Sequence, residues 1–293
     1  MLTISNMTKH YGDLRVLDDV SFEVGRGRLT GFVGANGSGK TTTMRIILGV
    51  LAADSGSIQL DGSPLTREGR RRFGYMPEER GLYPKMKVHE QLVYLARLRG
   101  MRAGIAAEKA DELLERLELH ERRDDPVEKL SLGNQQRAQI AAALVHDPEV
   151  LVLDEPFSGL DPMAVETVLS VLSERAASGV PVLFSSHQLE VVERLCDDIV
   201  VIAGGTIRAA GTRDALRAAN AGSQWELQVG DDAAWVRALP EVAVIEFDGG
   251  YVLFEADAHE AQLVLQQAAK RGEVHRFAPR RPTLTEIFRE VVK

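Results

Sequence analysis

Residues 34 to 42 read Gly34-Ala35-Asn36-Gly37-Ser38-Gly39-Lys40-Thr41-Thr42, which is the G-x-x-x-x-G-K-[ST] pattern of a phosphate-binding loop. The apolar residues 29–33 before it predict a short buried strand, and residues 42–48 after it predict a helix. Glycines let backbone N–H groups point inward around an anion, and the N-terminus of the helix adds partial positive charge. The segment therefore predicts a nucleoside triphosphate site.

Within this loop, two side chains have specific expected roles. Lys40 is expected to reach the β- and γ-phosphates, and Thr41 is expected to give its hydroxyl to Mg²⁺. The other expected contacts in the loop are Gly34, Asn36, Gly37, Ser38, Gly39 and Thr42. A chance match to the pattern should occur in on the order of one per cent of chains this long, and the flanking strand and helix make chance rarer still.

The bulk composition describes a soluble globular protein. The 293 residues suffice for one large or two ordinary domains, with 44% hydrophobic and 27% charged residues. A net charge of −8 argues against nucleic acid as a partner. With Cys196 as its one cysteine, the chain can form no intramolecular disulfide, which fits a reducing cytoplasm.

We also expect no signal peptide and no transmembrane segment. The first residues lack a basic region followed by an apolar core, and no apolar run is long enough to span a bilayer. Any work at a membrane would then need a second chain to supply the membrane part.

Strand-like and helix-like segments alternate along the first two thirds of the chain. Residues 2–4, 16–24, 150–153 and 180–186 read as strands, and residues 85 to about 145 as a largely helical insertion. This order predicts an α/β fold with a mostly parallel sheet that binds its ligand at the C-terminal ends of the strands.

Tyr11 is expected in the turn between the first two strands, just before the phosphate loop. An exposed aromatic ring there could stack on a nucleotide base, although an ordinary turn tyrosine is an equal alternative. Val16, in the strand that follows, is also among the expected nucleotide contacts.

Asp154 and Glu155 directly follow the apolar strand at residues 150–153. Asp154 is in the usual place for a carboxylate that holds Mg²⁺, and Glu155 could orient and deprotonate a water in line with the γ-phosphate. His187, at the end of another strand, could contact the γ-phosphate and fix that water. The alternatives are an inconsequential acid pair and a buried structural histidine.

These motifs, in this order, resemble the nucleotide-binding subunit of an ATP-binding-cassette (ABC) transporter over about residues 1 to 213. The motifs are Tyr11, the phosphate loop, Glu78, Leu130-Ser131-Leu132-Gly133-Asn134, Asp154-Glu155, Ser158-Gly159-Leu160-Asp161 and His187. The resemblance implies an ATPase with a RecA-like core, an antiparallel β subdomain and a helical subdomain at about 85–145.

The resemblance also implies a head-to-tail dimer of two copies around two ATP molecules. Each ATP would lie between the phosphate loop of one copy and the signature segment of the other, with Ser131 and Gly133 reaching the opposite γ-phosphate. Asn134 and Asp161 are further expected contacts. Hydrolysis would then depend on dimer closure, which can drive a membrane partner.

The chain departs from the family pattern in two motifs. The usual signature Leu-Ser-Gly-Gly-Gln is here Leu-Ser-Leu-Gly-Asn, so that Leu132 replaces a glycine and Asn134 a glutamine. Glu78 stands where the family usually has a glutamine that touches Mg²⁺ and the attacking water. A carboxylate there could bind the metal but adds negative charge beside the phosphates.

Residues 214–293 change character and read as a small α+β domain, with an element order that suggests a ferredoxin-like arrangement. A short helix is expected at 233–239 and a last helix at 284–292. This domain, the variant signature and the segment from Pro77 resemble the ATPases of drug-resistance and sodium-extrusion exporters, whose membrane subunit is a separate chain.

The main prediction is therefore an ATPase subunit at the cytoplasmic face of the membrane that powers export. The loop and helix from Glu78 to about Arg99 are the expected contact with the membrane partner. A soluble ABC-type ATPase acting on ribosomes or DNA would normally carry two cassettes or a long coiled coil, and this chain has neither. A P-loop kinase or GTPase would not explain the signature segment.

Overall fold

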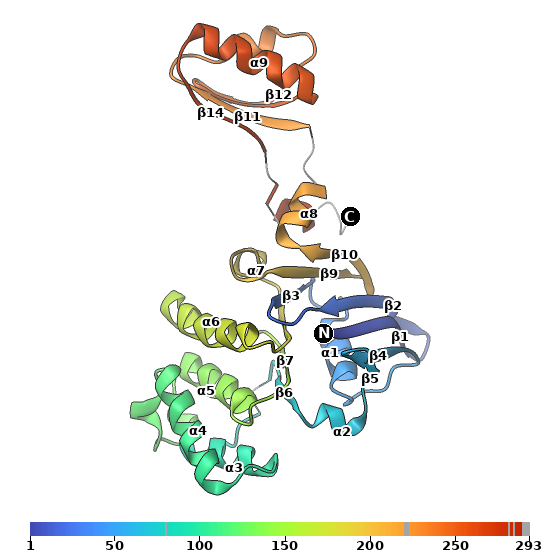
Figure 1. Ribbon diagram of the computed structural model, residues 1–293, viewed down its shortest axis with the longest axis vertical. Coiled ribbons are helices and arrows are strands. Elements are labelled where there is room, and N and C mark those ends of the chain that lie inside the picture. The colour runs from blue at the N-terminus through green and yellow to red at the C-terminus, as the bar shows by residue number, and fades with distance from the viewer. Residues whose placement is uncertain (80, 220–222, 281, 284, 289–293) are drawn as a thin grey trace. The chain divides into compact units, whose positions relative to one another are not determined.

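The computed structural model describes residues 1–79, 81–219, 223–280, 282–283 and 285–288. The chain divides into two compact units, with the boundary between Arg213 and Asp214 (Figure 1). Each unit has a sheet and a hydrophobic core of its own, and they are described separately below.

The first unit is built on a six-stranded sheet with the order β10-β9-β3-β8-β7-β6. All neighbouring pairs are parallel except β10 with β9, at one edge. Every residue of β3, β7 and β8 is buried, as expected for a parallel sheet covered on both faces. The strands are β3 (Leu29–Val33), β6 (Phe73–Met76), β7 (Val150–Leu153), β8 (Val182–Ser186), β9 (Asp198–Ala203) and β10 (Thr206–Thr212).

A second, antiparallel sheet of the same unit has the order β2-β1-β4-β5. Its strands are β1 (Leu2–Tyr11), β2 (Leu14–Val24), β4 (Ser55–Leu60) and β5 (Ser63–Pro64). One core cluster joins this sheet, helix α1 (Lys40–Ile47) and one face of the parallel sheet. Burial of this cluster anchors the helix that follows the phosphate loop.

Strands β1 and β2 are longer than their sequences predict. The pairing register shifts at three places between Ile4 and His10, so that apolar residues do not alternate simply along β1. Tyr11 consequently ends β1, and the turn itself is formed by Gly12 and Asp13.

Helices occupy the segment between β6 and β7, as the periodicity predicts. Helix α3 packs against α4 and α5 through buried apolar residues such as Leu92, Ala96 and Leu113. The helical elements of the first unit, besides α1, are α2 (Arg67–Arg70), α3 (Val88–Leu98), α4 (Ala103–Arg116), η1 (His120–Arg122), η2 (Val127–Lys129), α5 (Leu132–Leu144), α6 (Pro162–Ala177) and α7 (Leu189–Leu195).

The second unit is an antiparallel sheet with the order β12-β13-β11-β14 and its own core. Its elements are β11 (Gln224–Val229), η3 (Ala234–Ala238), β12 (Ala243–Asp248), β13 (Tyr251–Glu255), α9 (Ala258–Arg271) and β14 (Val274–Pro279), while α8 (Arg213–Ala219) begins at the boundary. Two interleaved strand–helix–strand units give this order, which is the split βαβ arrangement of ferredoxin-like domains.

The structure describes one of the two helices predicted in this unit in full and the other in part. The segment at 233–239 forms a 3₁₀ helix, η3. Of the helix expected at 284–292, residues 285–288 are helical, and residues 284 and 289–292 lie outside the described part of the chain. In the part of the chain that the structure describes, no helix is both long and apolar enough to cross a membrane.

Candidate nucleotide site

The C-terminal ends of four neighbouring parallel strands bring the expected site residues together. The phosphate loop follows β3, His187 follows β8, Asp154 and Glu155 follow β7, and the loop of Glu78 follows β6. A backbone hydrogen bond of 2.8 Å from Asp154 N to Met76 O ties the last two strand ends together. This edge of the sheet is where open parallel sheets bind ligands.

A pocket of about 260 Å³ lies at this edge. All the residues that line it are among the sequence predictions, and they come from the phosphate loop, the acid pair and two flanking segments. They are Val16, Asn36, Gly37, Gly39, Lys40, Thr41, Thr42, Glu78, Asp154 and Glu155.

Glycine is required in the phosphate loop for two separate reasons. Gly39 has a φ of +110°, and a Cβ there would lie 2.6 Å from Leu17 Cδ2. At Gly34 a Cβ would lie 2.4 Å from the carbonyl oxygen of Ile202. Larger residues at these positions would therefore push the loop off the strands beneath it.

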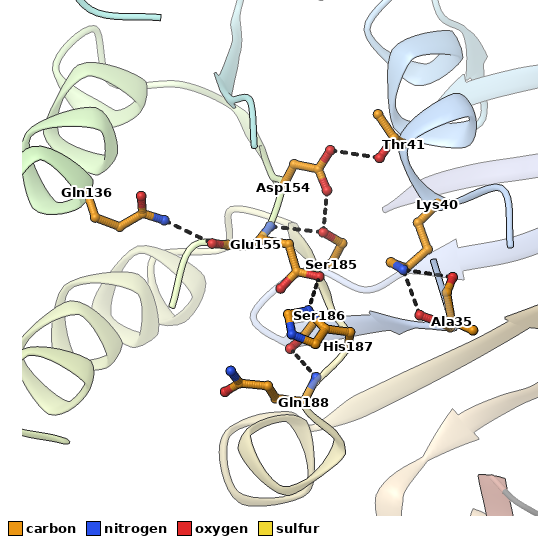
Figure 2. Close-up of polar contacts among 11 residues, drawn as sticks. Ala35, Lys40, Thr41, Gln136, Asp154, Glu155, Ser185, Ser186, His187 and Gln188 are labelled. Atoms are coloured by element: carbon orange, nitrogen blue, oxygen red, sulfur yellow. Dashed lines mark hydrogen bonds and ion pairs between the residues drawn. The ribbon is translucent and has the colours of Figure 1, made fainter. Parts of the chain in front are cut away.

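Lys40 is 7% exposed, and its ammonium lies against the loop that it belongs to. Its Nζ donates to the carbonyl oxygens of Gly34, at 2.6 Å, and Ala35, at 3.2 Å (Figure 2). Burial lowers the pKa of Lys40, whereas the carboxylates of Glu155, Asp154 and Glu78 raise it. This places a positive charge where a triphosphate would need one.

Thr41 and Asp154 present hydroxyl and carboxylate oxygens to each other across the pocket. Thr41 Oγ1 donates to Asp154 Oδ2 at 3.1 Å. Mg²⁺ is commonly bound by one or two protein oxygens together with waters and substrate phosphates, and this pair fits that pattern. Among the described residues no group of three or more His, Cys, Asp or Glu side chains could hold a metal by itself.

Glu155 and His187 form a pair beside the pocket. His187 Nδ1 lies 2.9 Å from Glu155 Oε1, with the imidazole half-exposed and the carboxylate largely buried (Figure 2). Burial raises the pKa of Glu155, and the hydrogen bond and charge of His187 lower it in part. A carboxyl group with a raised pKa is better able to accept a proton from water.

The backbone of Glu155 has a φ of +53°, which is uncommon for a residue other than glycine. Two neighbours that the sequence analysis missed hold it. Glu155 N donates to Ser185 Oγ at 2.9 Å, and Gln136 Nε2 donates to Glu155 O at 2.9 Å (Figure 2). Ser185 Oγ in turn donates to Asp154 Oδ1. Ser185 lies two residues before His187, and residues two apart in an extended strand are on the same face. This spacing is the one sequence signal that could have indicated Ser185 as a site residue.

The remaining expected residues lie outside the lining of this pocket. Gly34 and Ser38 belong to the phosphate loop itself, and Tyr11 is 51% exposed at the end of β1. Ser131 accepts a hydrogen bond from Asn134 N at the start of α5, and Asp161 caps α6 by accepting from Ala164 N at 2.9 Å. Gly133 lies at the start of α5, where a Cβ would be 3.6 Å from the carbonyl oxygen of Gly159. The signature segment and the turn before α6 are therefore neighbours.

Comparisons with known proteins agree with this geometry. A family model described as ABC transporter matches residues 17–158, and one described as ATP-binding protein DrrA1-3-like, C-terminal domain, matches residues 211–292. The ABC transporter ATP-binding protein YhaQ of Bacillus subtilis (strain 168) is 39% identical over 293 residues, covering 100% of this chain and 98% of that protein.

Two further proteins extend the comparison. Nod factor export ATP-binding protein I of Ralstonia nicotianae is 35% identical over 298 residues, covering 98% of this chain and 92% of that protein. A solved structure of the ATP-binding subunit of an ABC transporter matches with a TM-score of 0.69 at 33% identity, covering 75% of this chain and 92% of that one. The chain therefore belongs to the ATP-binding proteins of ABC transporters, a family that hydrolyses ATP, and it carries the DrrA-like C-terminal domain of one of their branches.

Proposed function

We propose that this chain is the ATP-hydrolysing subunit of an exporter. It acts as a head-to-tail dimer around two ATP molecules and drives a separate, multi-spanning permease from the cytoplasmic face of the membrane. The observation that carries the proposal is the Glu155–His187 pair at 2.9 Å, placed beside a pocket lined by Lys40, Thr41 and Asp154.

Hydrolysis follows from the surroundings of these residues. Lys40 and the backbone N–H groups of the phosphate loop bind the β- and γ-phosphates and stabilise the negative charge that moves onto the leaving group. Glu155 accepts a proton from the attacking water, and its backbone contacts with Ser185 and Gln136 fix the carboxylate. His187 orients that carboxylate and lies close enough to position the water.

Thr41 and Asp154 would hold Mg²⁺, with Glu78 as a further oxygen donor on the same pocket wall. When bound, the metal neutralises charge on the phosphate oxygens. Glu78 also adds negative charge near Lys40: burial lowers the pKa of Lys40, and Glu78, together with Glu155 and Asp154, offsets part of that lowering.

The signature segment supports dimerisation because it is presented to solvent. Leu132, directly after Ser131, is 59% exposed, and Met163, at the start of α6, is 76% exposed. The two lie on segments that are neighbours through Gly133 and Gly159. Exposed apolar side chains that flank Ser131 and Asp161 suit a face that a second copy covers.

The surface formed by α3 and the loop before it supports a membrane partner. Tyr83, Tyr94 and Leu98 are 57%, 41% and 64% exposed, and the two tyrosine rings meet edge to face with centroids 6.4 Å apart. The loop that carries Glu78 leads from the nucleotide pocket to this surface. The export direction is supported by the relative named for Nod factor export.

Replacing the proposed base tests the proposal. Glu155→Gln keeps the size of the side chain but not its ability to take a proton, so we expect turnover to fall by about 100-fold or more. ATP binding, measured with a fluorescent ATP analogue, should stay near the wild-type value. Glu149→Gln, a change at a more exposed glutamate that pairs with Arg72, is the matched control and should retain turnover. Wild-type turnover in Glu155→Gln would remove Glu155 as the base.

A further inference from the structure

Helix α5 carries two buried glutamines that belong to none of the motifs described above. Gln136 is 5% exposed and Gln139 is 4% exposed. Three residues apart on one helix, they lie on the same face about one turn from each other. Both side-chain amides donate hydrogen bonds to main-chain carbonyl oxygens of loops that are distant in the sequence.

Gln136 binds the segment that carries the proposed base. Its Nε2 donates to Glu155 O at 2.9 Å (Figure 2). The same Nε2 also donates to Pro156 O at 3.1 Å. Because Glu155 has a φ of +53°, its peptide needs such contacts to stay in that conformation. Gln136 thereby helps to fix the direction of the carboxylate.

Gln139 binds the loop on the other side of the pocket. Its Nε2 lies 3.5 Å from Pro77 O and 3.3 Å from Glu79 O, the carbonyl oxygens on either side of Glu78. The two glutamines therefore connect α5 to both carboxylate-bearing loops of the nucleotide pocket.

A leucine would fill the position of Gln139 without the cost of burying an amide. Gln139 Oε1 is buried and has no hydrogen-bond partner among the described residues, so the amide is incompletely satisfied. The amide of Gln139 can donate hydrogen bonds from Nε2 to the Glu78 loop, and a leucine at this position could not.

We propose that α5 aligns the Glu78 loop with the Glu155 segment through Gln136 and Gln139, and that Gln139 is a positioning residue for ATP hydrolysis. The inference rests on the roles proposed above for Glu155 and Glu78. Since α5 begins at the signature segment, a shift of this helix moves both loops together. When the signature segment contacts the second ATP, movement of α5 therefore changes the positions of Glu78 and Glu155 in the same copy.

The chain offers a matched comparison at Gln91, on α3. Gln91 is 1% exposed, and neither of its amide atoms has a hydrogen-bond partner among the described residues. Gln91→Leu makes the same chemical change at a similar degree of burial and removes no hydrogen bond to either loop.

The test measures kcat and KM for ATP in the full-length chain. We expect Gln139→Leu to lower kcat by about 3- to 10-fold, the range for one lost hydrogen bond, with KM within about twofold of wild type. Gln91→Leu should leave both values unchanged. In a Glu78→Ala background, Gln139→Leu should have less than about a twofold effect, because the carboxylate that it positions is gone. Gln139→Met serves if the leucine variant does not fold.

Three results would overturn the inference: wild-type kcat in Gln139→Leu, an equal loss in Gln91→Leu, or an undiminished loss in the Glu78→Ala background. Failure of the proposed function is recognised separately, because Glu155→Gln would then retain turnover. An inactive Glu155→Gln with additive effects of Glu78 and Gln139 rejects only the role of α5.

Discussion

Asp154 and Glu155 are consecutive carboxylates with different surroundings. Asp154 is 2% exposed and accepts hydrogen bonds from Thr41 and Ser185. Glu155 faces His187, and burial raises its pKa. From these different environments we expect Asp154 to bind charge and Glu155 to transfer a proton.

The pair of Glu155 and His187 predicts a change in pH dependence. The base form of Glu155 exists above its pKa, which burial raises, so turnover is lost as the pH falls through that raised value. His187 lowers this pKa, and His187→Ala should therefore move the acid limb of kcat to higher pH. His187→Gln, which can still donate a hydrogen bond, should move it less. An acid limb that stays in place, or moves to lower pH, would contradict the pairing.

Ser185 predicts a loss of turnover without a loss of ATP binding. Its hydroxyl joins Asp154 Oδ1 to Glu155 N, so Ser185→Ala frees both acidic residues at once. We expect kcat to fall by about tenfold, in line with losing a hydrogen bond to a charged group. Ser186→Ala, next along the strand, removes only a contact with Gln188 N and is the control. Equal effects of the two variants would show that Ser185 has no special role.

At the scale of elements, Ser131 combines two functions at the start of α5. It caps the helix, accepting from Asn134 N at 3.3 Å, and it is the proposed contact with the second γ-phosphate. Ser131→Ala should lower the free energy of unfolding by about 0.5–1 kcal/mol and also reduce ATPase activity. Ser131→Asp keeps the cap but sets a carboxylate against phosphate, so it should retain stability and lose activity. Denaturant unfolding and turnover assays separate the two, and an active Ser131→Asp would rule out the phosphate contact.

Elements with regular periodicity were predictable, and those with irregular backbone were not. The helices between β6 and β7 repeat apolar residues at helical spacing, and they form where expected. Strand β1 was underestimated because register shifts between Ile4 and His10 interrupt its alternation. At 234–238 the periodic pattern indicates a helix but does not distinguish an α-helix from the 3₁₀ helix that forms.

The residues of the candidate site also fall into those that the sequence predicts and those that it does not. The phosphate loop and the acid pair are contiguous in sequence, and the lining of the pocket contains only residues that the sequence indicated. Ser185, Gln136 and Gln139 act on carbonyl or amide groups of segments 19 to 62 residues away. The spacing of Ser185 to His187 is the one local hint of such contacts, and the two glutamines leave none. They required the structure.

At the scale of the whole molecule, the chain holds two units with separate cores. The nucleotide site lies entirely within Met1–Arg213, and the second unit surrounds Phe254 and Val264 with its own apolar cluster. The residues that the first unit exposes around Tyr83 and Tyr94 are where we expect the permease to bind, so the transported substrate would be selected by that other chain.

The most direct test of the account is a pull-down from native membranes using the full-length Glu155→Gln variant with MgATP. Lys40→Ala, which lacks the phosphate-binding ammonium, is the control for nucleotide-dependent assembly. We predict that a multi-spanning membrane protein co-purifies with Glu155→Gln in a complex of two copies each, and that nucleotide does not trap this complex for Lys40→Ala. Recovery of ribosomes, nucleic acid or only soluble proteins with Glu155→Gln would contradict the account.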